Sequence, residues 1–148
     1  MIETKFHPNG SLKSVCKKEA YQNYENEADS GKEVNLQTGA FVTFDDKGKV
    51  KEIGQYSTEC LQGTISNPGR FIWQSSLVWS KTFDVNGKVE KAFGRKKDFP
   101  VDGEMLKILK KHKLWYAVGK ALSAKKGTAL KSILTHSIKQ TRSSKEIE

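Results

Sequence analysis

The sequence predicts an α+β fold, in which an antiparallel β-meander of repeated hairpins is followed by C-terminal amphipathic helices. Three observations support this prediction: a turn motif that recurs, runs of β-favouring residues between its copies, and a change of hydrophobic period after residue 100. The glycines of the three motif copies, Gly10, Gly48 and Gly87, are spaced 38 and 39 residues apart. Periods of this size indicate repeated supersecondary units.

Each copy of the motif has an aromatic residue, polar residues, a glycine and an aliphatic residue, over 6–12, 44–50 and 83–89. Asp and Asn side chains can close a turn on their own backbone, and glycine takes a positive φ without steric cost. A turn of this kind makes a short hairpin loop. Apolar residues stand in phase around all three turns, so we expect the motif to build the fold rather than to perform chemistry. The in-phase positions are Phe6, Phe44 and Phe83 before the turn, then Leu12, Val50 and Val89, and then Val15, Ile53 and Ala92 after it.

The first hundred residues predict a series of strands. Residues 1–22 predict strand, turn and strand, and the polar stretch 23–31 predicts a loop. Strands are expected at 36–44 and 50–56. The stretch 57–70 contains Gly63 and the turn signal Asn67-Pro68-Gly69, so a turn is expected there. Aromatic and β-branched runs at 71–73 and 77–79, and then 89–93, complete at least six strands joined mainly by hairpins.

The helical region follows Pro100, which interrupts the β pattern. Asp102 is a candidate N-cap, and apolar residues then recur at spacings of three and four, which is typical of a helix. We expect helices at about 102–124 and 128–140, packed on or beside the sheet, since an apolar sheet face needs a cover. The expected domain organisation is a hairpin meander over 1–99 and a basic helical segment over 100–148, packed on the same domain.

Composition limits the protein class. With 148 residues the chain fits one domain, and it has no uncharged run long enough to span a membrane. The first residues lack the apolar region of a signal peptide, and Cys16 and Cys60 are expected to be free thiols in a reducing compartment. We therefore expect a cytoplasmic protein. No spacing of ligands predicts a metal site, and no motif predicts a cofactor.

Charge is distributed unevenly along the chain. The formal net charge is +9, of which residues 1–103 carry +1 and residues 104–148 carry +8. A basic segment of this kind favours contact with the phosphate backbone of nucleic acid or with another acidic surface. The alternative is a solvated helix face that only keeps the protein soluble. The candidate binding residues are all lysines of this segment: Lys107, Lys110, Lys111, Lys113, Lys120, Lys125, Lys126 and Lys131.

The stretch 39–56, Gly-Ala-Phe-Val-Thr-Phe-Asp-Asp-Lys-Gly-Lys-Val-Lys-Glu-Ile-Gly-Gln-Tyr, resembles the bacterial variant of the MORN repeat. That pattern runs from a glycine and an aromatic residue through an acidic pair, Gly-Lys, an aliphatic residue and Lys-Glu to a later Gly-x-Tyr. The copies around Gly10 and Gly87 match it only at the turn, and their spacing is longer than that of the family. The resemblance implies hairpins side by side in a twisted sheet and a role in interaction, often antitoxin-like, rather than in catalysis.

Other site classes were weighed against structural roles. Histidine is the usual residue for acid–base catalysis at neutral pH, but His7, His112 and His136 stand in no catalytic spacing, and turn geometry accounts for Asp45, Asp46 and Asp84. The aromatic residues Tyr56, Phe71, Trp73 and Trp79 are expected in a core rather than as a base-stacking platform. A helix-turn-helix around Gly127 fits poorly, and a membrane-surface role for Trp115 and Tyr116 is a minor alternative.

The sequence thus predicts a small, cytoplasmic, non-enzymatic binding protein of bacterial or phage type, with no catalytic residues. Its basic C-terminal helices are expected to engage nucleic acid or an acidic protein surface. The alternative is an inhibitor or antitoxin-like protein that acts on a protein target through its β-sheet face. An exposed strand edge could also pair with a second copy to form a homodimer.

Overall fold

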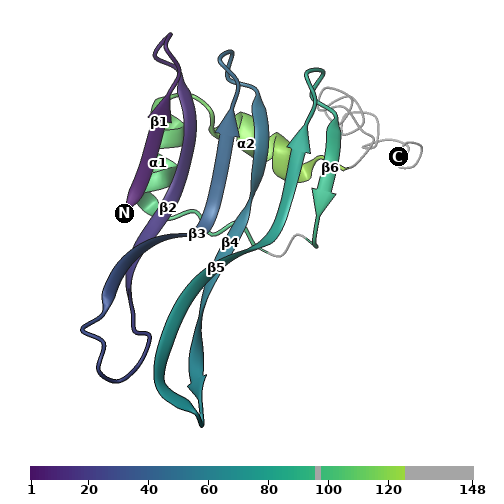
Figure 1. Cartoon of the computed structure of the whole chain (residues 1–148). Coiled ribbons are helices and arrows are strands. Elements are labelled where there is room, and N and C mark those ends of the chain that lie inside the picture. Colours follow the sequence, from purple (N-terminus) through teal and green to yellow (C-terminus); the bar gives the residue numbers. More distant parts are fainter. Residues whose placement is uncertain (96–97, 126–148) are drawn as a thin grey trace.

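The computed structural model describes residues 1–95 and 98–125 of the chain. It contains a six-stranded antiparallel sheet of consecutive hairpins and two C-terminal helices (Figure 1). The α+β class is confirmed. The elements are β1 (Ile2–Phe6), β2 (Leu12–Asn23), β3 (Lys32–Phe44), β4 (Val50–Thr64), β5 (Asn67–Phe83), β6 (Val89–Phe93), α1 (Gly103–Lys111) and α2 (Trp115–Ser123).

The sheet is a simple meander in which spatial order equals chain order, from β1 to β6. The three hairpins that carry the repeated motif share one irregularity of register. In each, the residue pair nearest the turn is displaced by one residue, at Phe6↔Leu12, Phe44↔Val50 and Phe83↔Val89. The sequence repeat is therefore a structural repeat, and the three turns lie along one end of the sheet (Figure 1).

The three turns have the same backbone hydrogen bonds. In the second turn, Asp45 N donates to Lys49 O and Gly48 N donates to Asp45 O, and the other two turns repeat this pattern. The turn glycines have φ values of 89°, 85° and 84°, which L side chains rarely adopt. The Asp45 carboxylate also accepts from the amides of Lys47 and Lys49, as expected for a turn that closes on its own side chain.

The hydrophobic core lies between the sheet and the two helices, which cover one face of the sheet (Figure 1). Of the nine in-phase apolar residues, seven are buried, because they point to this face. Phe6 and Ala92, on the outer strands, are exposed. The helices contribute Met105, Leu109, Val118 and Ala121 to the same core, and Ala124, just after α2, joins them.

The helical region differs from the expected single helix at 102–124. Asp102 is the N-cap as predicted, and its carboxylate accepts from Met105 N at 2.9 Å. However, α1 ends at Lys111, and Lys113 has a φ of 59° in the connection to α2. The amide of Leu114 reaches back to Leu109 O, a pattern that ends helices. The Leu114 side chain then packs under the second turn, 3.4 Å from where a Cβ on Gly48 would lie.

The stretch 57–70 also differs from expectation, because it is strand. β4 and β5 remain paired to Thr64↔Asn67, so the prediction of a turn at Asn67-Pro68-Gly69 is wrong. The hairpin turns two residues earlier, at Ile65 and Ser66. Gly69 is needed for a tertiary reason, because a Cβ there would lie 2.4 Å from the backbone nitrogen of Glu27.

Two long hairpins project beyond the helices and form what we call the arm, residues 19–37 and 57–77 (Figure 1). The pairing of β3 with β4 stops at Gly39↔Tyr56, and in the arm an isolated bridge joins Tyr24, just after β2, to Phe71 in β5. Tyr24 and Phe71 exchange both backbone hydrogen bonds at 2.8 Å, and the rings of Tyr21 and Trp73 stack with centroids 4.5 Å apart. The arm is therefore a small packed unit. The rest of the sheet, residues 1–18, 38–56 and 78–95, is called the upper sheet below.

Candidate nucleic-acid interface

The exposed lysines of α1 form the core of the candidate site. In this helix Met105 and Leu109 are buried against the sheet, so residues on the opposite side point to solvent. Lys107, Lys110 and Lys111 lie three and four residues apart and are exposed. Residues at this spacing are neighbours on a helix surface. The local fold thus brings three predicted site residues together.

The remaining predicted lysines are placed as follows. Lys113 and Lys125 are exposed, in the connection between the helices and just after α2, respectively. Lys120 is half-buried, and its ammonium lies 5.2 Å from the centre of the Tyr116 ring. Lys126 and Lys131, together with the expected helix at 128–140, lie outside the described residues.

Within the part of the chain that the structure describes, none of these lysines forms an ion pair, although Glu104 lies three residues before Lys107 in α1. Across residues 1–95 and 98–125, the ion pairs formed by lysine and arginine involve Lys17, Lys18 and Arg70, all in strands. Lys110 and Lys111 lie in the last turn of α1, where positive charge also favours the helix dipole by about 0.3–1 kcal/mol each. The interaction with the helix dipole needs no acidic side chain as a partner, so the ammonium groups of Lys110 and Lys111 stay available to a ligand.

A lysine from the sheet fixes the end of α2. The Lys81 ammonium donates to three carbonyl oxygens there, at 3.2 Å to Ala121, 2.8 Å to Leu122 and 2.6 Å to Ala124. A cation at a helix C-terminus satisfies orphan carbonyls and the dipole together. Sequence reasoning missed this role. Lys81 lies between the core residues Trp79 and Phe83 on the same face of β5, and its acceptors are 40 or more residues away in the chain.

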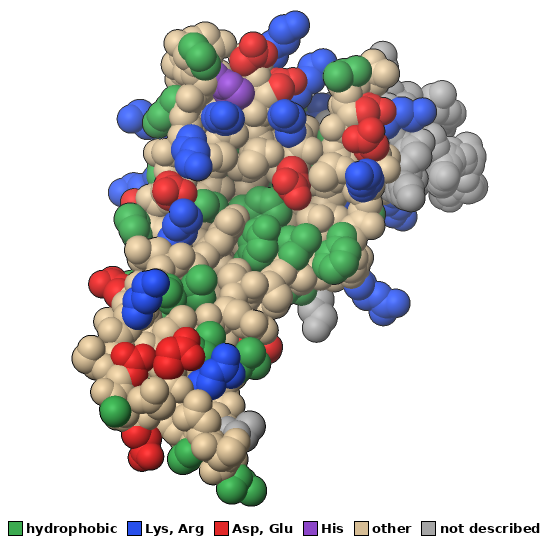
Figure 2. Space-filling view, in the orientation of Figure 1, with side chains coloured by type: hydrophobic (Ala, Val, Ile, Leu, Met, Phe, Trp, Pro, Cys, Tyr) green, Lys and Arg blue, Asp and Glu red, His purple; other side chains and the backbone are tan. Residues whose placement is uncertain are grey.

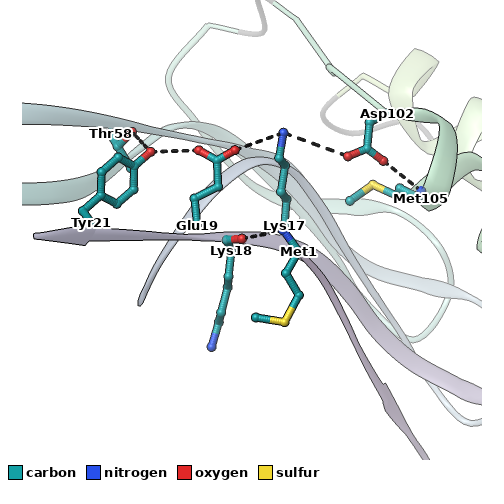
Figure 3. A network of polar contacts seen from close by, with 8 residues as sticks. All are labelled: Met1, Lys17, Lys18, Glu19, Tyr21, Thr58, Asp102 and Met105. Atoms are coloured by element: carbon teal, nitrogen blue, oxygen red, sulfur yellow. Dashed lines mark hydrogen bonds and ion pairs between the residues drawn. The ribbon is translucent and has the colours of Figure 1, made fainter. Parts of the chain in front are cut away.

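A polar network fixes the start of α1 against the sheet and the arm (Figure 3). The Lys17 ammonium lies 4.0 Å from the Asp102 carboxylate and 3.4 Å from Glu19. Tyr21 continues the network: its hydroxyl donates to Glu19 at 2.9 Å and lies 3.0 Å from the hydroxyl of Thr58. The Tyr21 hydrogen bond, followed by the contact with Lys17, lowers the pKa of Glu19. The network therefore holds the N-terminal end of α1, opposite the turn that carries Lys110 and Lys111, against the sheet and the arm.

The titratable residues weighed as catalytic groups have structural partners. His7 Nε2 lies 3.0 Å from the carbonyl oxygen of Phe44, which links the first turn to the second. The ring of His112 packs on Phe6, with centroids 5.8 Å apart. The carboxylates of Asp45 and Asp84 accept backbone amides within their own turns. His136 lies outside the described residues.

The aromatic residues weighed as a stacking platform are dispersed. Trp79 is buried, and its indole nitrogen donates to Asp98 O at 2.8 Å. Trp73 stacks on Tyr21 within the arm, whereas Tyr56 packs on Phe41, with centroids 5.1 Å apart. Phe71 alone among the four is exposed. The described structure does not bring them together on one surface.

A shallow hollow of about 190 Å³ lies on the uncovered face over β1, β2 and β3. The half-buried thiol of Cys16 lies in it, 3.8 Å from the Glu3 carboxylate. Burial, with the Glu3 charge adding to it, raises the pKa of this thiol, which disfavours the nucleophilic thiolate. Hydrogen bonding to Lys18 lowers the pKa of Glu3. The other cysteine, Cys60, is also free.

Among the described residues, no group of three or more His, Cys, Asp or Glu side chains could hold a metal ion. The described helices also include none that is long and apolar enough to cross a membrane.

Comparison with known proteins assigns the chain to no family. No protein-family model matches the chain. No curated protein and no solved structure was found to be similar to it. The resemblance of residues 39–56 to the bacterial MORN variant therefore stays a prediction.

Proposed function

We propose that this protein is a non-enzymatic nucleic-acid-binding protein, and that the exposed lysines of α1 contact the phosphate backbone. The observation that carries the proposal is the cluster of Lys107, Lys110 and Lys111 on the solvent side of a helix whose other side is buried. Lysines without an acidic partner are suited to phosphate contacts, because each contact releases condensed counterions.

The proposed contact is with the backbone and not with base edges. Lysine is a flexible point charge, whereas base discrimination in the major groove is commonly made by the planar groups of Arg, Asn and Gln. Residues 100–125 contain none of these three residue types. We therefore expect binding that is largely independent of sequence and strongly dependent on salt.

The direct test is fluorescence anisotropy with a labelled DNA duplex and a labelled RNA strand at low salt. The test variant carries Lys107→Gln, Lys110→Gln and Lys111→Gln. The matched control carries Lys13→Gln, Lys49→Gln and Lys88→Gln, which removes the same charge from exposed lysines beside the hairpin turns. We expect the test variant to bind on the order of ten- to a hundredfold more weakly than the control. Equal affinities of the two variants would contradict the assignment to α1, and no binding by the unaltered protein would end the proposal.

A further inference from the structure

The outer surface of the two helices carries one exposed aromatic ring among its lysines. Tyr116, in the first turn of α2, is 65% exposed, and no other large hydrophobic or aromatic side chain within residues 98–125 is exposed. Helix geometry explains its position, because Tyr116 lies on the side of α2 opposite to Val118 and Ala121, which are buried against the sheet. Its neighbour Trp115 is half-buried and packs against the core.

Positive charge flanks this ring along the chain. Both helices pack their apolar sides on the same face of the sheet, so their solvent sides form one outer surface (Figure 1). Residues 105–125 contain six Lys and no Asp or Glu. The Lys120 ammonium lies over the Tyr116 ring, 5.2 Å from its centre, and Lys113 is exposed just before α2. The uncovered face of the sheet, by contrast, has acidic side chains interspersed with basic ones (Figure 2).

The connection between the helices keeps the ring near the lysines of α1. Lys113 N donates to Lys110 O and Leu114 N donates to Leu109 O, so the chain folds back on the end of α1 before α2 begins. Tyr116 follows Lys111 by five residues, and even a fully extended chain of this length spans at most about 18 Å. One short segment of nucleic acid can therefore contact the ring and the α1 lysines together.

From this arrangement we propose that Tyr116 is a base-stacking residue and that the ligand of the helical surface is single-stranded nucleic acid. The inference rests on the proposed phosphate-binding role of α1 and extends it to unpaired bases. Lys120 lies over one face of the ring, and with 65% of the side chain exposed the other face is open to a base. Stacking on an aromatic ring accepts any base, because every base has a π-face.

A duplex cannot use the ring in this way. Its bases are paired and stacked on each other inside the double helix, and extruding one of them costs free energy. Phosphate contacts of the α1 lysines are open to single and double strands alike. The Tyr116 ring therefore adds affinity for single strands only, with little dependence on their sequence.

A membrane surface is the competing ligand for a basic helical surface with an exposed aromatic residue. Helices that lie on lipid insert an apolar face into the boundary between headgroups and acyl chains. Here the apolar faces of both helices are occupied by the sheet, since Met105, Leu109, Val118 and Ala121 are buried in the core. A single exposed ring surrounded by lysines is better suited to a base and its phosphates.

An abasic strand tests the stacking contact, because it keeps the phosphates and lacks the bases. Fluorescence anisotropy compares it with oligothymidine and oligouridine of the same length and with a duplex. We expect the unaltered protein to bind the strands with bases roughly 5- to 100-fold more tightly than the abasic strand. Tyr116→Ala should abolish this difference, and Tyr116→Trp should preserve it. Because no phosphate contact is lost, Tyr116→Ala should bind the duplex with unchanged affinity and salt dependence, which also shows that it is folded.

The matched control is Phe93→Ala. Phe93 belongs to the upper sheet and is 54% exposed, and it points away from the helices because its neighbour Ala92 lies in the row of Lys81, whose ammonium reaches α2. Its replacement should leave the preference for strands with bases intact. An equal effect of Phe93→Ala and Tyr116→Ala would overturn the assignment to Tyr116.

The outcomes separate this inference from the proposed function on which it rests. If the unaltered protein binds the duplex, the oligonucleotides and the abasic strand equally well, the stacking role is wrong and the phosphate-binding role of α1 stands. If the unaltered protein binds none of them, both are wrong. If Tyr116→Ala loses binding to vesicles that contain phosphatidylserine but keeps full affinity for oligothymidine, the ring contacts lipid, and the inference is overturned.

Discussion

Replacement of Lys81 by methionine should loosen the end of α2 and destabilise the whole protein. The substitution keeps the aliphatic stem, which lies in the core-facing row of β5, and removes the ammonium that donates to Ala121 O, Leu122 O and Ala124 O. A hydrogen bond that involves a charged group contributes about 1.5–3 kcal/mol, and a cation at a helix C-terminus adds about 0.3–2 kcal/mol.

These contributions do not add fully, because one ammonium serves all three acceptors and loses its hydration when it is half-buried. We therefore expect a loss of about 2–3 kcal/mol in the free energy of unfolding. For a chain of this size that loss corresponds to a decrease of about 4–12 °C in Tm. Denaturant unfolding followed by tryptophan fluorescence measures the loss. Lys13→Met is the control, because Lys13 is exposed and its replacement should change stability by no more than about 0.5 kcal/mol.

Amide hydrogen exchange distinguishes the proposed cause from a general effect on the sheet. In the Lys81→Met variant, the amides of α2 should lose more protection than those of the hairpin between β1 and β2. The reasoning is refuted if Lys81→Met and Lys13→Met unfold at the same denaturant concentration, or if protection falls equally in both regions.

Three further predictions concern the sheet. Gly54→Ala should destabilise the protein by about 1–3 kcal/mol, since the new Cβ would meet Trp79 O at 2.4 Å. Gly119→Ala lies in open space within α2 and should stabilise the protein by up to about 1 kcal/mol. If denaturant unfolding shows Gly54→Ala to be the more stable variant, the contact at Gly54 is contradicted. Asp45→Ala should lower the free energy of unfolding by about 1–2 kcal/mol, because it leaves two turn amides without their acceptor. Asp46→Ala is the control: its side chain is exposed, and the change should stay within about 0.5 kcal/mol. Equal losses would show that the carboxylate of Asp45 does not hold the turn. Burial raises the pKa of Glu52, so the folded state holds this proton more tightly and the contribution of Glu52 to stability should decline as pH rises through the carboxyl range. Glu52→Gln should reduce that decline, and an unchanged pH dependence would speak against burial of the carboxyl.

The repeated hairpins could be predicted from sequence because their determinants are local. Each glycine, its turn polar residues and the apolar positions around it lie within about ten residues of each other. The same is true of Asp102, whose carboxylate bonds three residues ahead. These features need no knowledge of the rest of the chain.

The features that were mispredicted or missed depend on distant contacts. Asn67-Pro68-Gly69 is typical of a turn, yet Gly69 serves the close approach of Glu27, which is 42 residues earlier. Lys113 adopts a positive φ with no glycine to signal it, and Leu114 packs beneath the turn at Gly48. The arm forms because β3 and β4 separate beyond Gly39↔Tyr56 and Tyr24, just after β2, bridges to Phe71 in β5; no periodicity in a single strand indicates such a bridge.

The candidate site was predictable only in part. The lysines of the basic segment were evident from charge counting, and the exposure of Lys107, Lys110 and Lys111 follows from helix geometry. The fixation of α1 through Lys17 and Tyr21, and of α2 through Lys81, required the tertiary structure.

The salt dependence of DNA binding tests the central claim most directly. The logarithm of the association constant falls with the logarithm of salt concentration by about 0.9 per phosphate contact. If Lys107, Lys110 and Lys111 each contact a phosphate, their replacement by glutamine should reduce the magnitude of the slope by about 2.7, while the Lys13, Lys49 and Lys88 replacements should leave it unchanged. A slope that is the same for both triple variants would contradict a phosphate-binding role for α1.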